Sequence, residues 1–317
     1  MEKIDAHMHV NFNDMNADDI IQYLDKNNIS ASWILTWEER TPQKARTYTP
    51  LLIDAVLEAH YKYPDRLIPF YAPPPTTDSI TLNNVFKKYI SLGIKGCGEL
   101  KASHLWREDI IDLYLKTLQN YDLPLIFHME GPRFFLPAKK EIGNPIELFY
   151  YKIIKNIFNQ LPIRLLNKYT DKLSRNLEKS FFKGYLYDFL ALEKMLNKYP
   201  EQIFIAHGPH FWNNISKNVS PKNNYNTGKI KNFGIIDSLL EEYDNLYCDI
   251  SGRSGFNGLT RDPEASKMFI DKHFKKILFG TDNYINFNHE QMINSFRLPK
   301  EKTQRIFYKN ALNIIPL

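Results

Sequence analysis

The stretch that decides the fold is KIDAHMH at residues 3–9, a short run in which apolar and polar residues alternate. Alternate side chains of a strand point to the same face, so Asp5, His7 and His9 are expected to share one face. Two imidazoles placed in this way can hold a single divalent metal ion. Residues 3–9 therefore predict a first β-strand that ends in half of a metal site.

Seven further β-prone runs follow, and helical patterns separate most of them. Most runs are almost continuously apolar, as expected for strands that are covered on both faces. The eight runs span residues 3–9, 31–37, 66–72, 93–101, 124–129, 202–207, 246–251 and 276–282. The amphipathic helical patterns span residues 17–26, 50–62, 82–92, 108–121, 187–199, 235–243 and 263–274.

This alternation predicts an α/β fold, a (β/α)8 TIM barrel, built as a single domain over residues 1–317. The alternative is an open, doubly wound sheet. That fold usually carries a glycine-rich phosphate turn after its first strand, and the sequence has none there.

Polar residues gather where the predicted strands end. His128 closes the fifth run, His207 the sixth and Asp282 the eighth, while Glu99 and Lys101 lie on one face of the fourth. Four of the nine histidines of the chain are therefore placed at strand ends. Because barrel enzymes carry their active sites at the carboxyl ends of the strands, this convergence predicts a metal centre at that mouth.

The same residues carry a resemblance to a known family. The chain resembles the amidohydrolase superfamily, and within it the group that includes aminocarboxymuconate-semialdehyde decarboxylase. The matching pieces are DAHMH at 5–9, FH at 127–128, AHG at 206–208, FGTD at 279–282 and KNA at 309–311. A stretch at 245–251 that runs on to 261–263 is similar to uncharacterised bacterial metal-dependent hydrolases. The family contains both hydrolases and non-oxidative decarboxylases, so these motifs do not specify the reaction.

The donor set favours a divalent cation, zinc above all, with manganese or iron(II) as alternatives. His7, His9 and Asp282 are the first ligand candidates, with His128 beside them. Asp282 is also the candidate for moving the proton between water and the leaving group. By resemblance, His207 polarises the substrate or holds the nucleophilic water.

Several interpretations remain open for the fourth run. Glu99 and Lys101 form an ion pair that braces the mouth, or Glu99 is a metal ligand that supports a second ion. In a third interpretation Lys101 is carboxylated and bridges two metals. We favour one metal, with Glu99 beside it as a ligand or proton relay. Asp249 is expected to stabilise the end of the seventh strand through hydrogen bonds.

Substrate contacts are expected from the loops that follow the strands. Trp37 is the candidate for an aromatic wall, and Lys101 lies at the mouth with it. Arg133 and Arg253, each just beyond a strand end, are placed to clamp a carboxylate or phosphate. These side chains predict a small-molecule substrate and are compatible with an anionic one.

One segment, residues 138–183, departs from the barrel pattern. It has ten Lys or Arg against four Asp or Glu, a balance of +6, and the remaining chain is at −1. Two apolar stripes at helical spacing, separated at Pro162, predict a helical hairpin inserted after the fifth strand. It is interpreted as a packed hairpin with a solvated basic face, as a lid, as a contact in a homo-oligomer, or as a loose attachment to an anionic membrane surface.

The composition limits the classes of protein to which the chain can belong. With 317 residues, 43% of them hydrophobic, the chain can build a large core. No apolar stretch is long enough for a transmembrane helix and no signal peptide is recognisable. Cys97 and Cys248 lie in apolar runs, which favours buried thiols and a cytoplasmic protein. No nucleic-acid-binding motif accompanies the basic segment, so nucleic acid is not expected as a partner.

The function that the sequence favours is a metal-dependent hydrolase in which an activated water attacks a C–N or C–O bond of a small molecule. The alternative is a non-oxidative decarboxylase of an aromatic or unsaturated carboxylic acid. A barrel kept as a binding module without turnover is a third interpretation. The presence of all of His7, His9, His128, His207 and Asp282 speaks against it.

Overall fold

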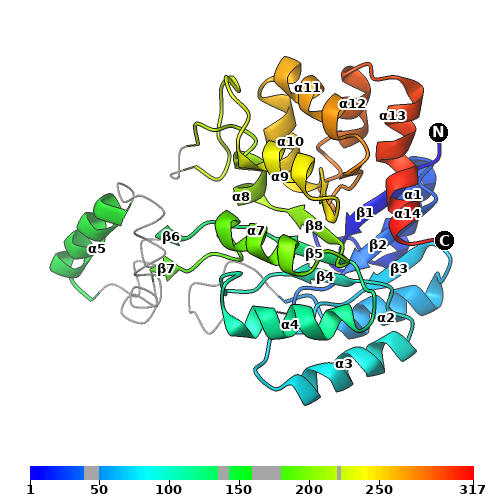
Figure 1. The fold of residues 1–317 in the computed structure, drawn as a ribbon, viewed down its shortest axis with the longest axis horizontal. Helices are drawn as coiled ribbons and strands as arrows, with labels where there is room; N and C mark the ends of the chain where they lie inside the picture. The colour runs from blue at the N-terminus through cyan, green and yellow to red at the C-terminus, as the bar shows by residue number, and fades with distance from the viewer. Residues whose placement is uncertain (39–49, 135–142, 159–179, 220–222) are drawn as a thin grey trace.

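The computed structural model describes residues 1–38, 50–134, 143–158, 180–219 and 223–317. Eight parallel strands of these residues surround a common axis (Figure 1). They are β1 (Ile4–Met8), β2 (Ala31–Leu35), β3 (Leu67–Phe70), β4 (Cys97–Leu100), β5 (Leu125–His128), β8 (Phe204–His207), β9 (Leu246–Asp249) and β10 (Ile277–Leu278). One sheet has the order β1-β2-β3 and the other the order β10-β9-β8-β5-β4.

Backbone hydrogen bonds join the two sheets at both of their edges. Between β3 and β4, the Tyr71 amide donates to the Gly96 carbonyl at 3.0 Å. Between β10 and β1, the Ala6 amide donates to the Phe279 carbonyl at 2.8 Å. The strands thus form a closed ring, and the predicted TIM barrel is confirmed.

The predicted helical patterns form the outer layer of the barrel. They correspond to α1 (Ala17–Lys26), α2 (Ile53–Lys62), α3 (Ser79–Ser91), α4 (Asp109–Gln119), α7 (Phe189–Lys198), α9 (Ile235–Glu242) and α11 (Pro263–His273). Two of these helices begin at side-chain N-caps. The Asn16 and Asp78 side chains accept amide hydrogen bonds from the first turns of α1 and α3. Short helices that the periodicity did not indicate are α8 (Pro209–Asn213), α10 (Gly252–Thr260), α12 (His289–Ser295), α13 (Lys300–Gln304) and α14 (Asn310–Ile314).

The barrel has an inner and an outer apolar core. Ile4 and Ala6 of β1 lie in the inner cluster with Trp33, whereas Met8 of the same strand lies in the outer cluster with Ile20. A regular strand places residues 4, 6 and 8 on one face. The pairing of β1 with β2 shifts register between residues 5 and 8, and this bulge reverses the alternation.

The bulge corrects one expectation. Asp5 does not share a face with His7 and His9 at the mouth. Its carboxylate instead accepts hydrogen bonds from the Thr281 hydroxyl at 2.6 Å and from the Thr281 amide at 3.0 Å. The burial of Asp5 raises its pKa to about 7, against the smaller lowering by these hydrogen bonds. Asp5 thus ties the start of β1 to the loop after β10.

Between β5 and β8 the chain leaves the barrel. A short antiparallel ribbon, β6 (Arg133–Phe134) and β7 (Phe181–Phe182), leads to α5 (Pro145–Phe158), which stands apart from the barrel (Figure 1). Five large apolar side chains of α5 are exposed: Ile146, Phe149, Tyr150, Ile153 and Ile157. The second half of the predicted hairpin, in residues 159–179, lies outside the described residues.

Two further findings concern the cysteines and the described helices. Cys97 and Cys248 are free, buried thiols, as expected. Among the described segments, no helix combines the length and the apolar character that a membrane crossing requires.

Candidate metal centre

His7 and His9 meet at the carboxyl end of β1. Their Nε2 atoms lie 3.2 Å apart, and both side chains are fully buried. The two Nδ1 atoms point away from each other: that of His9 lies 2.8 Å from the Leu35 carbonyl, and that of His7 lies 3.0 Å from Asp249 Oδ2. A carbonyl and a carboxylate only accept hydrogen bonds, so each Nδ1 carries a proton. The two Nε2 lone pairs are therefore directed into the same small space.

Asp282 completes a group of three donor atoms. It follows β10, and its backbone amide donates to the His7 carbonyl at 2.7 Å. Its Oδ1 lies 3.3 Å from His9 Nε2 and 3.9 Å from His7 Nε2, and this buried oxygen accepts no hydrogen bond. Burial raises the pKa of Asp282, but the nearby His9 side chain and the charges on His7 and His207 outweigh it and lower the pKa overall. Asp282 is thus an ionised carboxylate.

This geometry fits a divalent metal ion. Two ligand atoms on a tetrahedral ion, each about 2.0–2.1 Å from it, lie about 3.3–3.4 Å apart. The distances of 3.2 and 3.3 Å from His9 Nε2 to its two neighbours agree with that value, and the 3.9 Å distance corresponds to a wider angle. Two facing lone pairs beside a carboxylate repel each other unless a cation lies between them.

The protonation of His7 supports the same interpretation. Burial lowers the pKa of His7, but the carboxylates of Asp249 and Glu99 raise it well above its ordinary value. The surroundings of His7 thus favour positive charge at Nε2. Either a proton or a metal ion can supply it.

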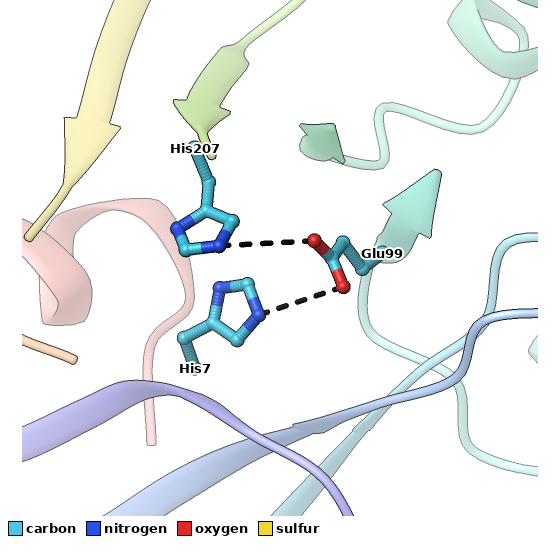
Figure 2. Close-up of side chains that lie close together, drawn as sticks. All are labelled: His7, Glu99 and His207. Atoms are coloured by element: carbon cyan, nitrogen blue, oxygen red, sulfur yellow. Dashed lines mark ion pairs between the residues drawn. The ribbon is translucent and has the colours of Figure 1, made fainter. Parts of the chain in front are cut away.

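Glu99 of β4 faces His7 and His207 across the mouth (Figure 2). Its Oε2 is 3.5 Å from His9 Nε2 and 3.8 Å from His7 Nε2, and Lys101 Nζ lies 3.0 Å from the same oxygen. Burial raises the pKa of Glu99, but Lys101 and His128 lower it well below the usual range. His7, Glu99 and His207 form a second group with donor atoms close enough for a metal ion.

His128 lies outside both of these groups. Its Nδ1 is 2.7 Å from Glu99 Oε1, and its Nε2 is 3.3 Å from Glu130 Oε2. Burial lowers the pKa of His128, but Glu99 and Glu130 raise it overall. Glu130 is itself buried and forms an ion pair with Arg133. His128 thus lies between the carboxylates of Glu99 and Glu130.

His207 lies at the end of β8, next to His7, with 4.4 Å between the ring centroids. Its Nδ1 is 3.0 Å from Asp249 Oδ1, and its Nε2 is 3.9 Å from Asp282 Oδ2. Burial lowers the pKa of His207 overall, although the Asp249 carboxylate raises it. A neutral ring with its proton at Nδ1 presents an accepting Nε2 to the centre of the mouth.

Aromatic and cationic side chains surround this centre. Trp37 lies 4.5 Å from the His9 ring and 5.1 Å from the Phe12 ring, between centroids, and Tyr284 lies 6.1 Å from Phe12. Lys101 Nζ lies 3.2 Å from the centroid of the Trp37 ring. These contacts form an aromatic wall beside His9, where the sequence placed Trp37.

The two arginines differ in their surroundings. Arg133 is engaged with Glu130, whereas the exposed Arg253 stacks over Tyr225, with 4.2 Å from its guanidinium carbon to the ring centroid. Sequence reasoning missed Glu130 and Phe12. The signal for Glu130 was its position two residues after His128, on the same face of an extended chain. Phe12 lies in a loop that no periodicity marks.

Comparison with known proteins supports the fold. No protein-family model matches the sequence, and no curated protein matches it. A TIM-barrel protein of uncharacterised function from Bordetella bronchiseptica superposes with a TM-score of 0.60 at 10% identity, over 99% of this chain and 98% of that one. A probable 2-pyrone-4,6-dicarboxylic acid hydrolase from Acinetobacter baumannii, with citric acid bound, has a TM-score of 0.57 at 13% identity and full coverage of both chains. These likenesses show the fold, a TIM barrel.

A third neighbour is a decarboxylase. It is 5-carboxyvanillate decarboxylase from Novosphingobium aromaticivorans, in complex with manganese and 4-hydroxy-3-methoxy-5-nitrobenzoic acid. Its TM-score is 0.52 at 14% identity, over 96% of this chain and 81% of that one. Neighbours with this fold therefore include both hydrolases and decarboxylases.

Proposed function

We propose that the protein is a metal-dependent enzyme of the amidohydrolase superfamily, in which His7, His9 and Asp282 hold one divalent cation. The observation that carries the proposal is the pair of Nε2 atoms 3.2 Å apart, each with its Nδ1 committed to an acceptor. Such outer partners fix the tautomer of metal-binding histidines. Glu99 lies beside the ligands, and His128 is assigned to bracing Glu99.

Zinc is the proposed ion, because two imidazoles and one carboxylate with a further position for water are typical of catalytic zinc. Manganese and iron(II) are the alternatives, and the decarboxylase neighbour holds manganese. When bound, the cation supplies Lewis acidity that makes a nucleophile available near neutral pH.

The proposed reaction is hydrolysis of a C–N or C–O bond in a small molecule. His207 Nε2 accepts a hydrogen bond from the attacking water and orients it. Asp282 takes the proton of that water and delivers it to the nitrogen or oxygen of the breaking bond. Trp37 and Phe12 cover one side of the substrate, and Arg253 meets an anionic group at the rim.

Decarboxylation is the second candidate, and the aromatic wall of Phe12, Trp37 and Tyr284 favours it. A flat wall beside the donor atoms suits a planar aromatic acid. In this reaction Asp282 takes a proton from water and delivers it to the ring carbon, the bond between that carbon and the carboxylate breaks, and carbon dioxide leaves. Lys101 lies at the same wall, where it meets the carboxylate of the substrate.

The test is a substrate panel with metal-loaded protein. Lactones, esters and amides report hydrolysis by acid release, and hydroxylated benzoic acids report decarboxylation by release of carbon dioxide. We expect turnover in one class, and a loss of about 10²-fold or more in Asp282→Asn. Asp271→Asn, a change at a surface ion pair with Lys302, serves as the control and should keep full activity. Absence of both metal binding and turnover across the panel would contradict the proposal.

A further inference from the structure

Asp249, at the end of β9, contacts two different histidines through its two oxygens. Oδ2 lies 3.0 Å from His7 Nδ1, and Oδ1 lies 3.0 Å from His207 Nδ1. All three side chains are buried, and Asp249 itself is fully so. One carboxylate therefore lies directly behind both a proposed metal ligand and the histidine proposed to orient water.

Asp249 can serve both rings at once only as an anion. Each of its oxygens faces a ring nitrogen, and Oδ1 also accepts a hydrogen bond from the Ser251 amide. An ionised carboxylate offers acceptors on both oxygens and no donor. Each histidine must therefore keep its proton at Nδ1 and direct the Nε2 lone pair to the mouth.

We infer that Asp249 is a shared positioning residue that sets the tautomers of His7 and His207 together. The inference deepens the proposed function, because it rests on His7 as a metal ligand and His207 as the residue that orients water. Loss of both acceptor oxygens would release both rings, whereas replacement of one oxygen by a donor would disturb only the ring that this oxygen faces. A residue that merely stabilised the strand end would leave both tautomers unchanged.

Contacts with Ser251 determine which way the side-chain amide of an Asp249→Asn variant would face. The Ser251 backbone amide donates to Asp249 Oδ1 at 3.0 Å, and its hydroxyl contacts the same oxygen. In Asp249→Asn the amide oxygen therefore stays at the Oδ1 position, and the NH2 group faces His7. A donor opposite Nδ1 forces His7 to carry its proton at Nε2, where the metal binds, while His207 keeps its acceptor.

The chain offers a control at another His–Asp pair, which is partly buried. His273 Nε2 lies 2.7 Å from Asp237 Oδ1, remote from the mouth, and Asp237→Asn makes the same chemical change there. Zinc affinity is measured for the whole protein by competition with a chromophoric chelator. We expect Asp249→Asn to bind zinc about 10–100-fold more weakly, as for other changes behind a metal ligand, and Asp237→Asn to bind as the parent does.

A second measurement determines the tautomers directly, in the parent protein and in the variant. Long-range ¹H–¹⁵N correlation spectra of histidine report which ring nitrogen carries the proton. In the parent protein, His207 is expected to be protonated at Nδ1 with or without zinc, and His7 at Nδ1 once zinc is bound. In Asp249→Asn, His207 keeps this tautomer.

The outcomes separate the two proposals. Unchanged zinc affinity in Asp249→Asn, or a proton at Nε2 of His207 in the parent, would overturn the role of Asp249. An equal loss of zinc affinity in Asp237→Asn would overturn it as well. Failure of the parent protein to bind any divalent metal would overturn the proposed function, while the His207 spectrum would still test Asp249.

Discussion

Gly252 provides a sharp test of where the Asp282 carboxylate lies. It is the first residue of α10, with a φ of +66°, and a Cβ built on it would lie 2.9 Å from Asp282 Oδ2 and 3.5 Å from His207 Cε1. Gly252→Ala therefore adds both backbone strain and a clash with the proposed metal ligand. The carboxylate must move by a few tenths of an ångström.

Gly228 separates the two effects. Its φ is +86°, and a Cβ added there meets nothing within 4 Å. Gly228→Ala should therefore cost only the left-handed backbone strain of an L-residue, about 1 kcal/mol of unfolding free energy. Gly252→Ala should cost this amount or slightly more, because the clash is with a side chain that can shift.

The distinguishing result is metal affinity. Metal sites tolerate displacements of only about 0.2 Å, so Gly252→Ala is expected to weaken zinc binding about tenfold or more, and Gly228→Ala to leave it unchanged. Urea unfolding gives the stability of each variant, and chelator competition gives the affinity. If Gly252→Ala bound zinc as tightly as the parent, the placement of Asp282 against α10 would be refuted.

Three further predictions concern stability. Burial raises the pKa of Glu108, but His104 and the Leu105 amide lower it overall to about 2. The folded form therefore binds this proton less readily than the unfolded chain, and the stabilisation present above pH 4.5 is lost as the pH falls towards 2. The difference in unfolding free energy between the parent and Glu108→Gln should shrink over that interval in urea titrations, and a constant difference would contradict the assignment. Trp33→Ala, in the inner core, should cost about 3–5 kcal/mol in the same assay, and a cost below 1 kcal/mol would contradict its packing. Phe149→Ser, on the exposed face of α5, should change stability by less than about 0.5 kcal/mol, and a large loss would show that the face is covered.

The sequence was sufficient to predict the barrel and the convergence of donor residues at its mouth. Continuous apolar runs predict strands covered on both faces, and parallel strands bring their carboxyl ends together, so His7, His207 and Asp282 meet although they are far apart in the chain. The prediction that two residues of spacing place His7 and His9 together also agrees with the structure. These expectations depend on periodicity, which the sequence displays directly.

The remaining features depend on tertiary contacts. The bulge in β1 turns Asp5 away from the mouth, and a register shift has no signature in the residues of one strand. The position of His128 between Glu99 and Glu130 follows from packing between strands. The sharing of Asp249 by two rings arises in the same way, because His7 and His207 belong to strands on either side of the mouth.

The most direct test of the metal centre is anomalous diffraction at the zinc edge from crystals grown with zinc. We predict one strong anomalous peak about 2.0–2.1 Å from the Nε2 atoms of both His7 and His9, with an Asp282 oxygen in the same coordination sphere. A peak held by other residues, or no peak while His7 and His9 keep their positions, would contradict the account.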